Sequence, residues 1–195
     1  MIQVLRGLVA IAIVVAIVGQ ALTNADRGTF NPANFFSYFT ILSNIASVWL
    51  LGRMALQPSW AKSNAVVRGA ITLYMAVTGI VDALLLSDVD VGLPEPWVDM
   101  ILHVGAPVFV VLDWFVFRAR QRLDRKVLLQ WLIFPAVYLV YSLVRGPIVD
   151  WYPYPFLDPR LESGYLGVAI TSVGVLVAFV VLGSIVRWWA GRRAN

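Results

Sequence analysis

Apolar residues run along this chain in six long blocks, and short polar segments separate the blocks. Each block is close to the ~20 residues that a helix needs to cross the hydrocarbon core of a bilayer. The pattern therefore predicts an all-α bundle of six transmembrane helices that forms one domain over residues 1–195. The predicted spans are Leu5–Leu22, Phe35–Leu56, Arg68–Leu86, Trp97–Phe117, Val127–Gly146 and Gly164–Trp189.

The first block has a second interpretation. Arg6, the apolar stretch that follows it and the small residues near Ala25 are also the features of a cleavable signal peptide. We expect the segment to be retained as a true membrane span.

Composition supports a membrane protein. Of the 195 residues 60% are hydrophobic and 13% are charged, whereas soluble domains have roughly a quarter charged residues. The absence of cysteine excludes disulfides, thiolate metal sites and cysteine nucleophiles. Only carboxylates would remain to complete a metal site around the single histidine, so we expect no metal and no cofactor. The net charge of +4 does not indicate nucleic-acid binding, because the basic residues lie in turns between apolar spans.

The charges of the turns alternate along the chain. One set of turns and ends is basic: Arg6, Arg53, Lys62, Arg68, Arg118, Arg120, Arg122, Arg125, Lys126, Arg187, Arg192 and Arg193. The other set holds Arg27 and Arg160 among eight acids: Asp26, Asp88, Asp90, Glu95, Asp99, Asp150, Asp158 and Glu162. Basic turns favour the cytoplasmic side, which predicts cytoplasmic N and C termini. This agrees with an even number of spans.

Polar residues recur inside the second span. Ser37, Thr40, Asn44 and Ser47 are spaced by three or four residues, which stacks them on one face of a helix. Hydrocarbon cannot satisfy such groups, so we expect this face to point to other helices or to a wet cavity.

Ionisable residues of other spans fall at a similar depth. With a rise of ~1.5 Å per residue, His103, Asp82 and Arg145 all lie near the external ends of their spans, as Thr40 does. We expect these residues to cluster in the outer half of the membrane, although Asp82 and Arg145 could simply neutralise each other. Asp113 lies near the cytoplasmic end instead, and we expect a structural ion pair there, with Arg53 or Arg118 as its partner.

The cluster has the components of a hydrolytic site. A hydroxyl such as that of Thr40 needs an adjacent base, and His103 is suited to this near neutral pH. Asp82 or Asp99 could orient the imidazole. Asn44, Tyr141 or Arg145 could donate hydrogen bonds to an oxyanion. In the simpler interpretation Thr40 bonds its own helix backbone and His103 is a packing residue.

The longest external loop is rich in aromatic residues and proline. The loop contains the aromatic residues Trp151, Tyr152, Tyr154 and Phe156, and prolines before Tyr154 and Phe156 hold the backbone extended. The loop is typical of an aromatic belt at the headgroup layer. Alternatively, it forms a lid over a site that opens to the outer leaflet.

The segment around Thr40 and the sequence His103-x-x-x-Pro107, with Asp113 farther on, resemble the androgen-induced protein family, also called FAR-17a-like. The loop from Tyr152 to Asp158 and Gly164-Tyr165 resembles a bacterial branch of these six-pass proteins, which implies the bacterial cytoplasmic (plasma) membrane. Animal members hydrolyse fatty acid esters of hydroxy fatty acids with a membrane-embedded threonine and a histidine. The resemblance implies these roles for Thr40 and His103.

We therefore expect a membrane-embedded hydrolase of fatty acyl esters whose partners are membrane lipids. The alternative is a non-catalytic protein that binds or transports lipids or small molecules, with Asp82, His103 and Arg145 as a relay or binding site. A polar path to the cytoplasmic side would favour transport. A third possibility is a scaffold whose aromatic loop binds a partner protein.

Overall fold

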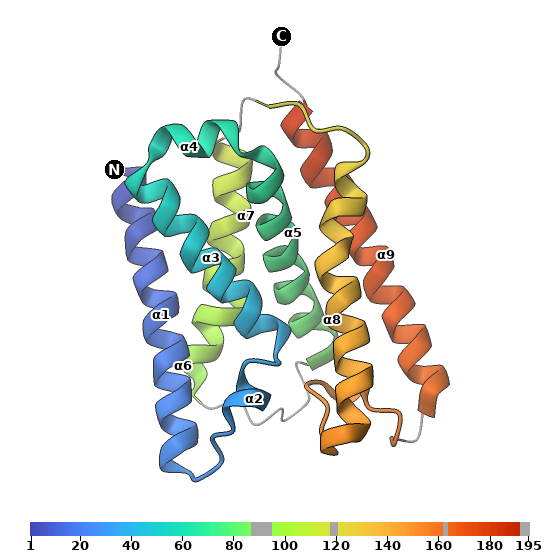
Figure 1. Cartoon of the computed structure of the whole chain (residues 1–195). Helices are drawn as coiled ribbons and strands as arrows, with labels where there is room; N and C mark the ends of the chain where they lie inside the picture. The colour runs from blue at the N-terminus through green and yellow to red at the C-terminus, as the bar shows by residue number, and fades with distance from the viewer. Residues whose placement is uncertain (87–94, 118–120, 162–163, 192–195) are drawn as a thin grey trace.

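The computed structural model describes residues 1–86, 95–117, 121–161 and 164–191, and the regular structure in these ranges is helical (Figure 1). The elements in chain order are α1 (Ile2–Asp26), α2 (Pro32–Phe35), α3 (Phe39–Leu56), α4 (Pro58–Ser63), α5 (Ala65–Val81), η1 (Asp82–Leu86), α6 (Pro96–Asp99), η2 (Met100–Gly105), α7 (Ala106–Val116), α8 (Val127–Val149), η3 (Pro155–Leu157) and α9 (Gly164–Gly191). The segments η1 and η2 are π-helical, and η3 is a 3₁₀ turn.

Six of these helical stretches are long and apolar enough to cross a membrane. They are Ile2–Asp26, Phe39–Leu56, Ala65–Leu86, Pro96–Val116, Val127–Val149 and Gly164–Ala190. The predicted six-helix fold is confirmed. The second span begins later than predicted, at Phe39 instead of Phe35.

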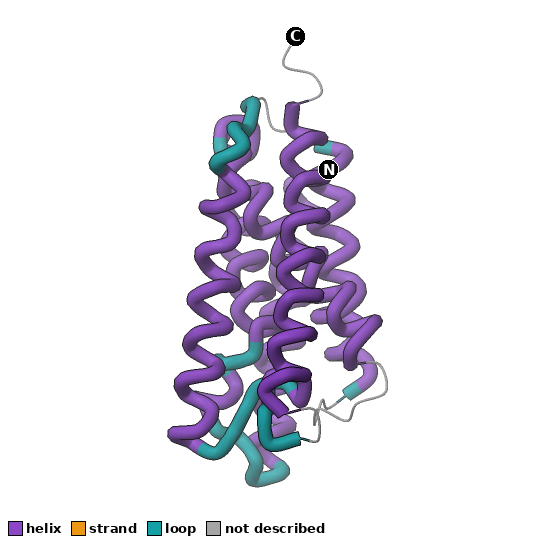
Figure 2. Tube along the Cα trace, turned by 90° about the vertical axis from the view of Figure 1, so that its right-hand side faces the viewer, coloured by secondary structure: helices purple, strands orange, loops and turns teal. Residues whose placement is uncertain are grey.

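The long helices run side by side along one axis, with the loops at the two ends (Figure 2). Helix α3 packs against α1 and α5, while α5 also packs against α7 and α9, so α5 is central. Helix α8 packs against α9. The start of α1, the end of α9 and helix α4 share one end of the bundle, and α2 and α6 lie at the other (Figure 1).

The outward faces of the helices are apolar. Leu8 of α1, Leu129 of α8 and Ile170 of α9 expose 58%, 70% and 64% of their surface, respectively. Water would penalise so much exposed hydrocarbon, whereas lipid tails solvate it. The chain is an integral membrane protein by this criterion and by the length of its apolar helices.

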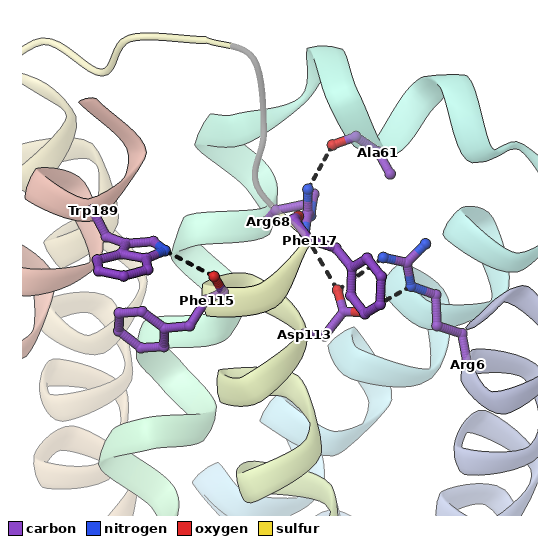
Figure 3. Close-up of polar contacts among 7 residues, drawn as sticks. All are labelled: Arg6, Ala61, Arg68, Asp113, Phe115, Phe117 and Trp189. Carbon is purple, nitrogen blue, oxygen red and sulfur yellow. Dashed lines mark hydrogen bonds and ion pairs between the residues drawn. The ribbon is translucent and has the colours of Figure 1, made fainter. Parts of the chain in front are cut away.

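A buried charge cluster joins three helices near the end of the bundle that carries α4 (Figure 3). Asp113 of α7 accepts hydrogen bonds from Arg6 at 2.8 and 3.1 Å and from Arg68 at 3.2 Å. Arg68 also donates to the carbonyls of Ala61 and Phe117, at 2.8 and 2.7 Å. The three charged side chains are at most 5% exposed.

The partners of Asp113 differ from those suggested by the sequence. Arg53 and Arg118 were the expected candidates because they lie at the same depth. Arg6 and Arg68 form the ion pairs instead, since the helices α1 and α5 turn these residues inward. Arg118 lies outside the described residues.

Candidate active site

Thr40 lies in the first turn of α3, because the helical structure is interrupted between α2 and α3, just before this residue. Helix α2 ends, a turn follows, and α3 begins only at Phe39. The Tyr138 hydroxyl donates to the carbonyl of Ser37 at 2.9 Å and so holds this turn. The expectation that Ser37 and Thr40 share one continuous helix is therefore wrong. As a consequence, the backbone N–H of Thr40 has no acceptor within its own helix.

His103 connects Thr40 to an acid. It is 4% exposed, and its Nε2 atom lies 3.2 Å from Oγ1 of Thr40. Its Nδ1 atom lies 2.7 Å from a carboxylate oxygen of Asp99, four residues earlier. With the ring proton on Nδ1, the Thr40 hydroxyl donates to Nε2 and Nδ1–H donates to Asp99. This is the order of nucleophile, base and orienting acid in a hydrolytic triad.

Close packing of α5 brings a second acid to the histidine. A Cβ atom at Gly79 would lie 3.1 Å from the backbone oxygen of His103, so only glycine allows this approach without a shift. Three residues later, a carboxylate oxygen of Asp82 lies 3.9 Å from Nε2. This distance exceeds a hydrogen bond. The sequence left Asp82 and Asp99 open as the orienting acid, and the hydrogen-bonded one is Asp99.

The same residues could hold a metal ion. Asp82, Asp99 and His103 each offer one ligand atom, and these atoms lie within 4.8 Å of one another. One imidazole and two carboxylates are a ligand set for a divalent cation. A cation on Nε2 would use the lone pair that has to accept the Thr40 proton. Metal binding there and the triad arrangement therefore exclude each other.

The external loop contributes Tyr154 to the site. Its hydroxyl oxygen accepts a hydrogen bond from the backbone N–H of Thr40 at 3.2 Å and lies 3.3 Å from Oγ1. Burial raises the pKa of Tyr154 to about 12, so the phenol is neutral at ordinary pH. Because its oxygen already accepts, its proton is available to Oγ1. Phe156 stacks on the ring with centroids 5.1 Å apart.

The rest of the loop is fastened to the bundle by charge and packing. Arg160 pairs with both Asp150 and Asp158, and its hydrogen bonds lower the pKa of the Asp158 carboxyl. The Tyr152 ring lies under the Arg160 guanidinium and against Gly146, where any Cβ would collide with it. Such fastening holds the segment that carries Tyr154 in one position.

Two of the predicted oxyanion donors have other partners. The side-chain amide of Asn44 donates to the backbone oxygens of Thr40 and Leu102 at 2.9 and 3.1 Å, so both of its protons are used. Asn44 thus ties α3 to η2. The Tyr141 hydroxyl lies 2.7 Å from the hydroxyl of Ser37 and supports the turn before α3.

Arg145 lies at the margin of the site. It donates to the side-chain oxygen of Asn34 at 2.7 Å, and its guanidinium lies 5.4 Å from the centre of the Trp151 ring. Asp82 instead faces His103, with 3.9 Å between a carboxylate oxygen and Nε2. The arrangement thus differs from the Asp82–Arg145 pair that the sequence left open.

Two cavities meet at Thr40. The larger, of about 340 Å³, lies among α3, α5, η1, α8, η3 and α9. Its walls are mainly apolar and include Val77, Val81, Leu139, Phe156, Leu176 and Phe179. The smaller, of about 50 Å³, extends toward α1 and is lined by Gln20 and Asn24 as well as His103. Gln20 was not among the predicted site residues, although it interrupts an otherwise apolar span.

Comparison with known proteins identifies one match. The family model described as FAR-17a/AIG1-like protein matches residues 72–187. The matched segment contains Asp82, Asp99, His103 and Tyr154, and Thr40 lies before it. No curated protein and no solved structure matches the chain.

Proposed function

The chain belongs to the FAR-17a/AIG1-like family, and from this premise we propose that it hydrolyses fatty acyl esters, with Thr40 as nucleophile and His103 as general base. The observation that carries the proposal is the hydrogen-bonded order Thr40–His103–Asp99 next to a large apolar cavity. Each of the three roles of a hydrolytic triad has a residue at hydrogen-bond distance.

In the first half of the reaction, Oγ1 of Thr40 attacks the ester carbonyl carbon while its proton passes to Nε2 of His103. Asp99 accepts the Nδ1–H bond and stabilises the imidazolium. The tetrahedral oxyanion forms beside the backbone N–H of Thr40, which has no acceptor within its helix and bonds the Tyr154 oxygen, and beside the Tyr154 hydroxyl. The positive end of the α3 dipole adds to this stabilisation. The C–O bond to the alcohol then breaks, and Nε2 returns the proton to the leaving alkoxide.

In the second half, water attacks the acyl-threonine carbonyl and gives a proton to Nε2. The bond between the acyl carbon and Oγ1 breaks, Oγ1 takes the proton back, and a fatty acid leaves. The enzyme is then unchanged, and one ester and one water have become one acid and one alcohol.

The volume and the apolar walls of the larger cavity support a lipid substrate. A volume of about 340 Å³ falls in the range of small-ligand pockets, and its apolar walls suit an acyl chain. We also propose that both termini are cytoplasmic, in accord with the basic turns. The site then lies in the outer half of the bilayer, because α6, which ends at Asp99, lies at the opposite end of the bundle from the start of α1 (Figure 1).

Labelling with a fluorophosphonate probe tests the nucleophile. We expect the detergent-solubilised protein to be labelled at Thr40, and labelling to be lost in Thr40→Ala and His103→Ala. Thr78→Ala is the matched control, because Thr78 is a buried threonine of the same cavity whose hydroxyl has no partner among the described residues. Labelling should persist in this control and in the presence of EDTA, which removes metal ions.

Turnover of a medium-chain umbelliferyl ester completes the test. The same two variants should lose turnover while they keep the elution volume of the folded protein. Turnover that persists in Thr40→Ala, or that EDTA abolishes, contradicts the proposal. A folded wild-type protein that is neither labelled nor active favours the alternative function of lipid binding or transport.

A further inference from the structure

The side chain of Gln20 is a buried polar group without a full set of partners. It lies in α1 and is 4% exposed. Its amide nitrogen donates to the side-chain oxygen of Asn24 at 3.1 Å, but its oxygen Oε1 has no hydrogen-bond partner among the described residues. A buried acceptor without a donor costs free energy of order 1–3 kcal/mol. Such a group therefore points to a polar molecule that binds beside it.

The smaller cavity, which Gln20 lines, has the size and the walls of a water site. Its volume of about 50 Å³ exceeds the ~30 Å³ share of one water molecule in the liquid. It is far below the size of pockets that hold lipid-sized ligands. Polar side chains of Gln20, Thr40, His103 and Tyr154 reach this cavity. Buried water needs 2–4 such partners, and the cavity supplies them.

The position of this cavity matches the second half of the proposed reaction. It shares Thr40, Leu86 and Tyr154 with the larger cavity, so the two meet at the nucleophile. An acyl chain in the larger cavity would leave the acyl carbon between the two cavities. A water in the smaller one would then lie next to both the acyl carbon and His103.

From this geometry we propose that the smaller cavity is the binding site of the hydrolytic water and that Gln20 is its positioning residue. Oε1 can only accept, so it fixes one O–H bond of the water and leaves the other O–H bond for Nε2 of His103. A lone pair of the water then faces the acyl carbon. The cavity admits water and excludes larger alcohols, which makes hydrolysis the outcome instead of acyl transfer. This inference rests on the proposed function.

Separate measurements of acylation and deacylation distinguish a failure of the Gln20 inference from a failure of the proposed function. Gln20→Leu keeps the size of the side chain and removes the acceptor, while Gln20→Glu keeps an acceptor oxygen at the same place. Acylation does not need the water, so the leucine variant should release umbelliferone in a normal burst and react with fluorophosphonate at the wild-type rate. Deacylation should slow by about 100-fold, the scale of a misplaced reactant. In this variant kcat and KM should fall together, and mass spectrometry should find acyl-Thr40.

The glutamate variant should deacylate within about tenfold of wild type, because it restores the acceptor. A leucine variant that deacylates like wild type overturns the role of Gln20. So does one that loses its burst and its fluorophosphonate reaction, because that pattern indicates a structural defect. In both cases acyl-Thr40 in the wild-type protein would leave the proposed function intact. Absence of acyl-Thr40 in every variant, in folded and reactive protein, would overturn the proposed function together with this inference.

Discussion

Replacing Asp99 by asparagine is the most informative test of how the histidine is held. The carboxylate lies 2.7 Å from Nδ1 and can only accept, so it keeps the ring proton on Nδ1 and leaves Nε2 free. An asparagine amide at this distance can donate instead. Donation to Nδ1 would shift the ring proton to Nε2, and Nε2 could then no longer accept the proton of Thr40. The geometry would be kept while the tautomer is reversed.

The magnitude follows from this loss of the base. In a serine protease triad the corresponding change lowers kcat by about 10⁴-fold, which is about 5.5 kcal/mol at 1.36 kcal/mol per factor of ten. The Asp99 side chain is 45% exposed, so part of its interaction with the imidazolium is screened by solvent. We therefore expect Asp99→Asn to lower kcat by about 10³-fold.

Asp82→Asn is the matched control. This carboxylate lies 3.9 Å from Nε2 and makes no hydrogen bond to the ring, so we expect less than about a tenfold loss of kcat. Both variants are assayed by umbelliferyl ester turnover and by the rate of fluorophosphonate labelling at Thr40. A larger loss in Asp82→Asn than in Asp99→Asn would refute the assignment of the orienting acid. Equal, small losses would refute the triad itself.

Three further changes test the site and the bundle. Tyr154→Phe removes a hydrogen-bond donor next to the reacting oxygen, and kcat/KM for the ester should fall by about 10²-fold; unchanged kinetics would exclude the tyrosine from the oxyanion site. Asp113→Asn leaves two buried arginines without a counter-charge and should lower the free energy of unfolding by about 3–5 kcal/mol. Arg6→Met leaves a neutral pair and should cost less in the same detergent unfolding assay; the reverse order would contradict the charge argument. Gly69→Ala pushes a methyl group into the Trp131 ring and should destabilise by about 1–3 kcal/mol. Gly174→Ala, where a Cβ meets no atom within 4 Å, should not destabilise; equal unfolding midpoints would refute this reasoning.

The membrane-spanning helices could be read from the sequence because each apolar block carries its own signal. The start of the second span could not. Phe35 to Phe39 continues the apolar pattern, and the break is stabilised by a tertiary contact in which the Tyr138 hydroxyl donates to the carbonyl of Ser37. This break leaves the backbone N–H of Thr40 without an acceptor in its own helix, and the N–H bonds Tyr154 of the loop instead. The feature that matters most for an oxyanion site was therefore invisible to periodicity.

The depth of a residue could be predicted, but its rotation about the helix axis could not. Depth placed Thr40, Asp82 and His103 at one level, and the structure has these residues together. Depth also placed Arg145 at this level, yet its side chain donates a hydrogen bond to Asn34 at the margin of the site. The π-helical segments η1 and η2 change the rotation where Asp82 and His103 lie. A regular helix with 3.6 residues per turn does not have this change of rotation, so it could not be predicted from the spacing of residues.

The roles of two polar residues of the first span, Arg6 and Gln20, could be recognised only from the fold. Arg6 supplies one of the two cations that neutralise Asp113, and Gln20 forms a wall of the smaller cavity. A polar side chain in an apolar span costs free energy unless a partner compensates it. The partner of Arg6 lies on α7, and the cavity that Gln20 lines is shared with residues of α3 and η2. Loss of the first segment would leave Asp113 with one arginine, open the cavity beside His103, and expose the face of α3 that packs on α1. A cleavable signal peptide contributes none of these contacts to the mature protein, so the packing favours retention of α1 as a structural and functional part of the bundle.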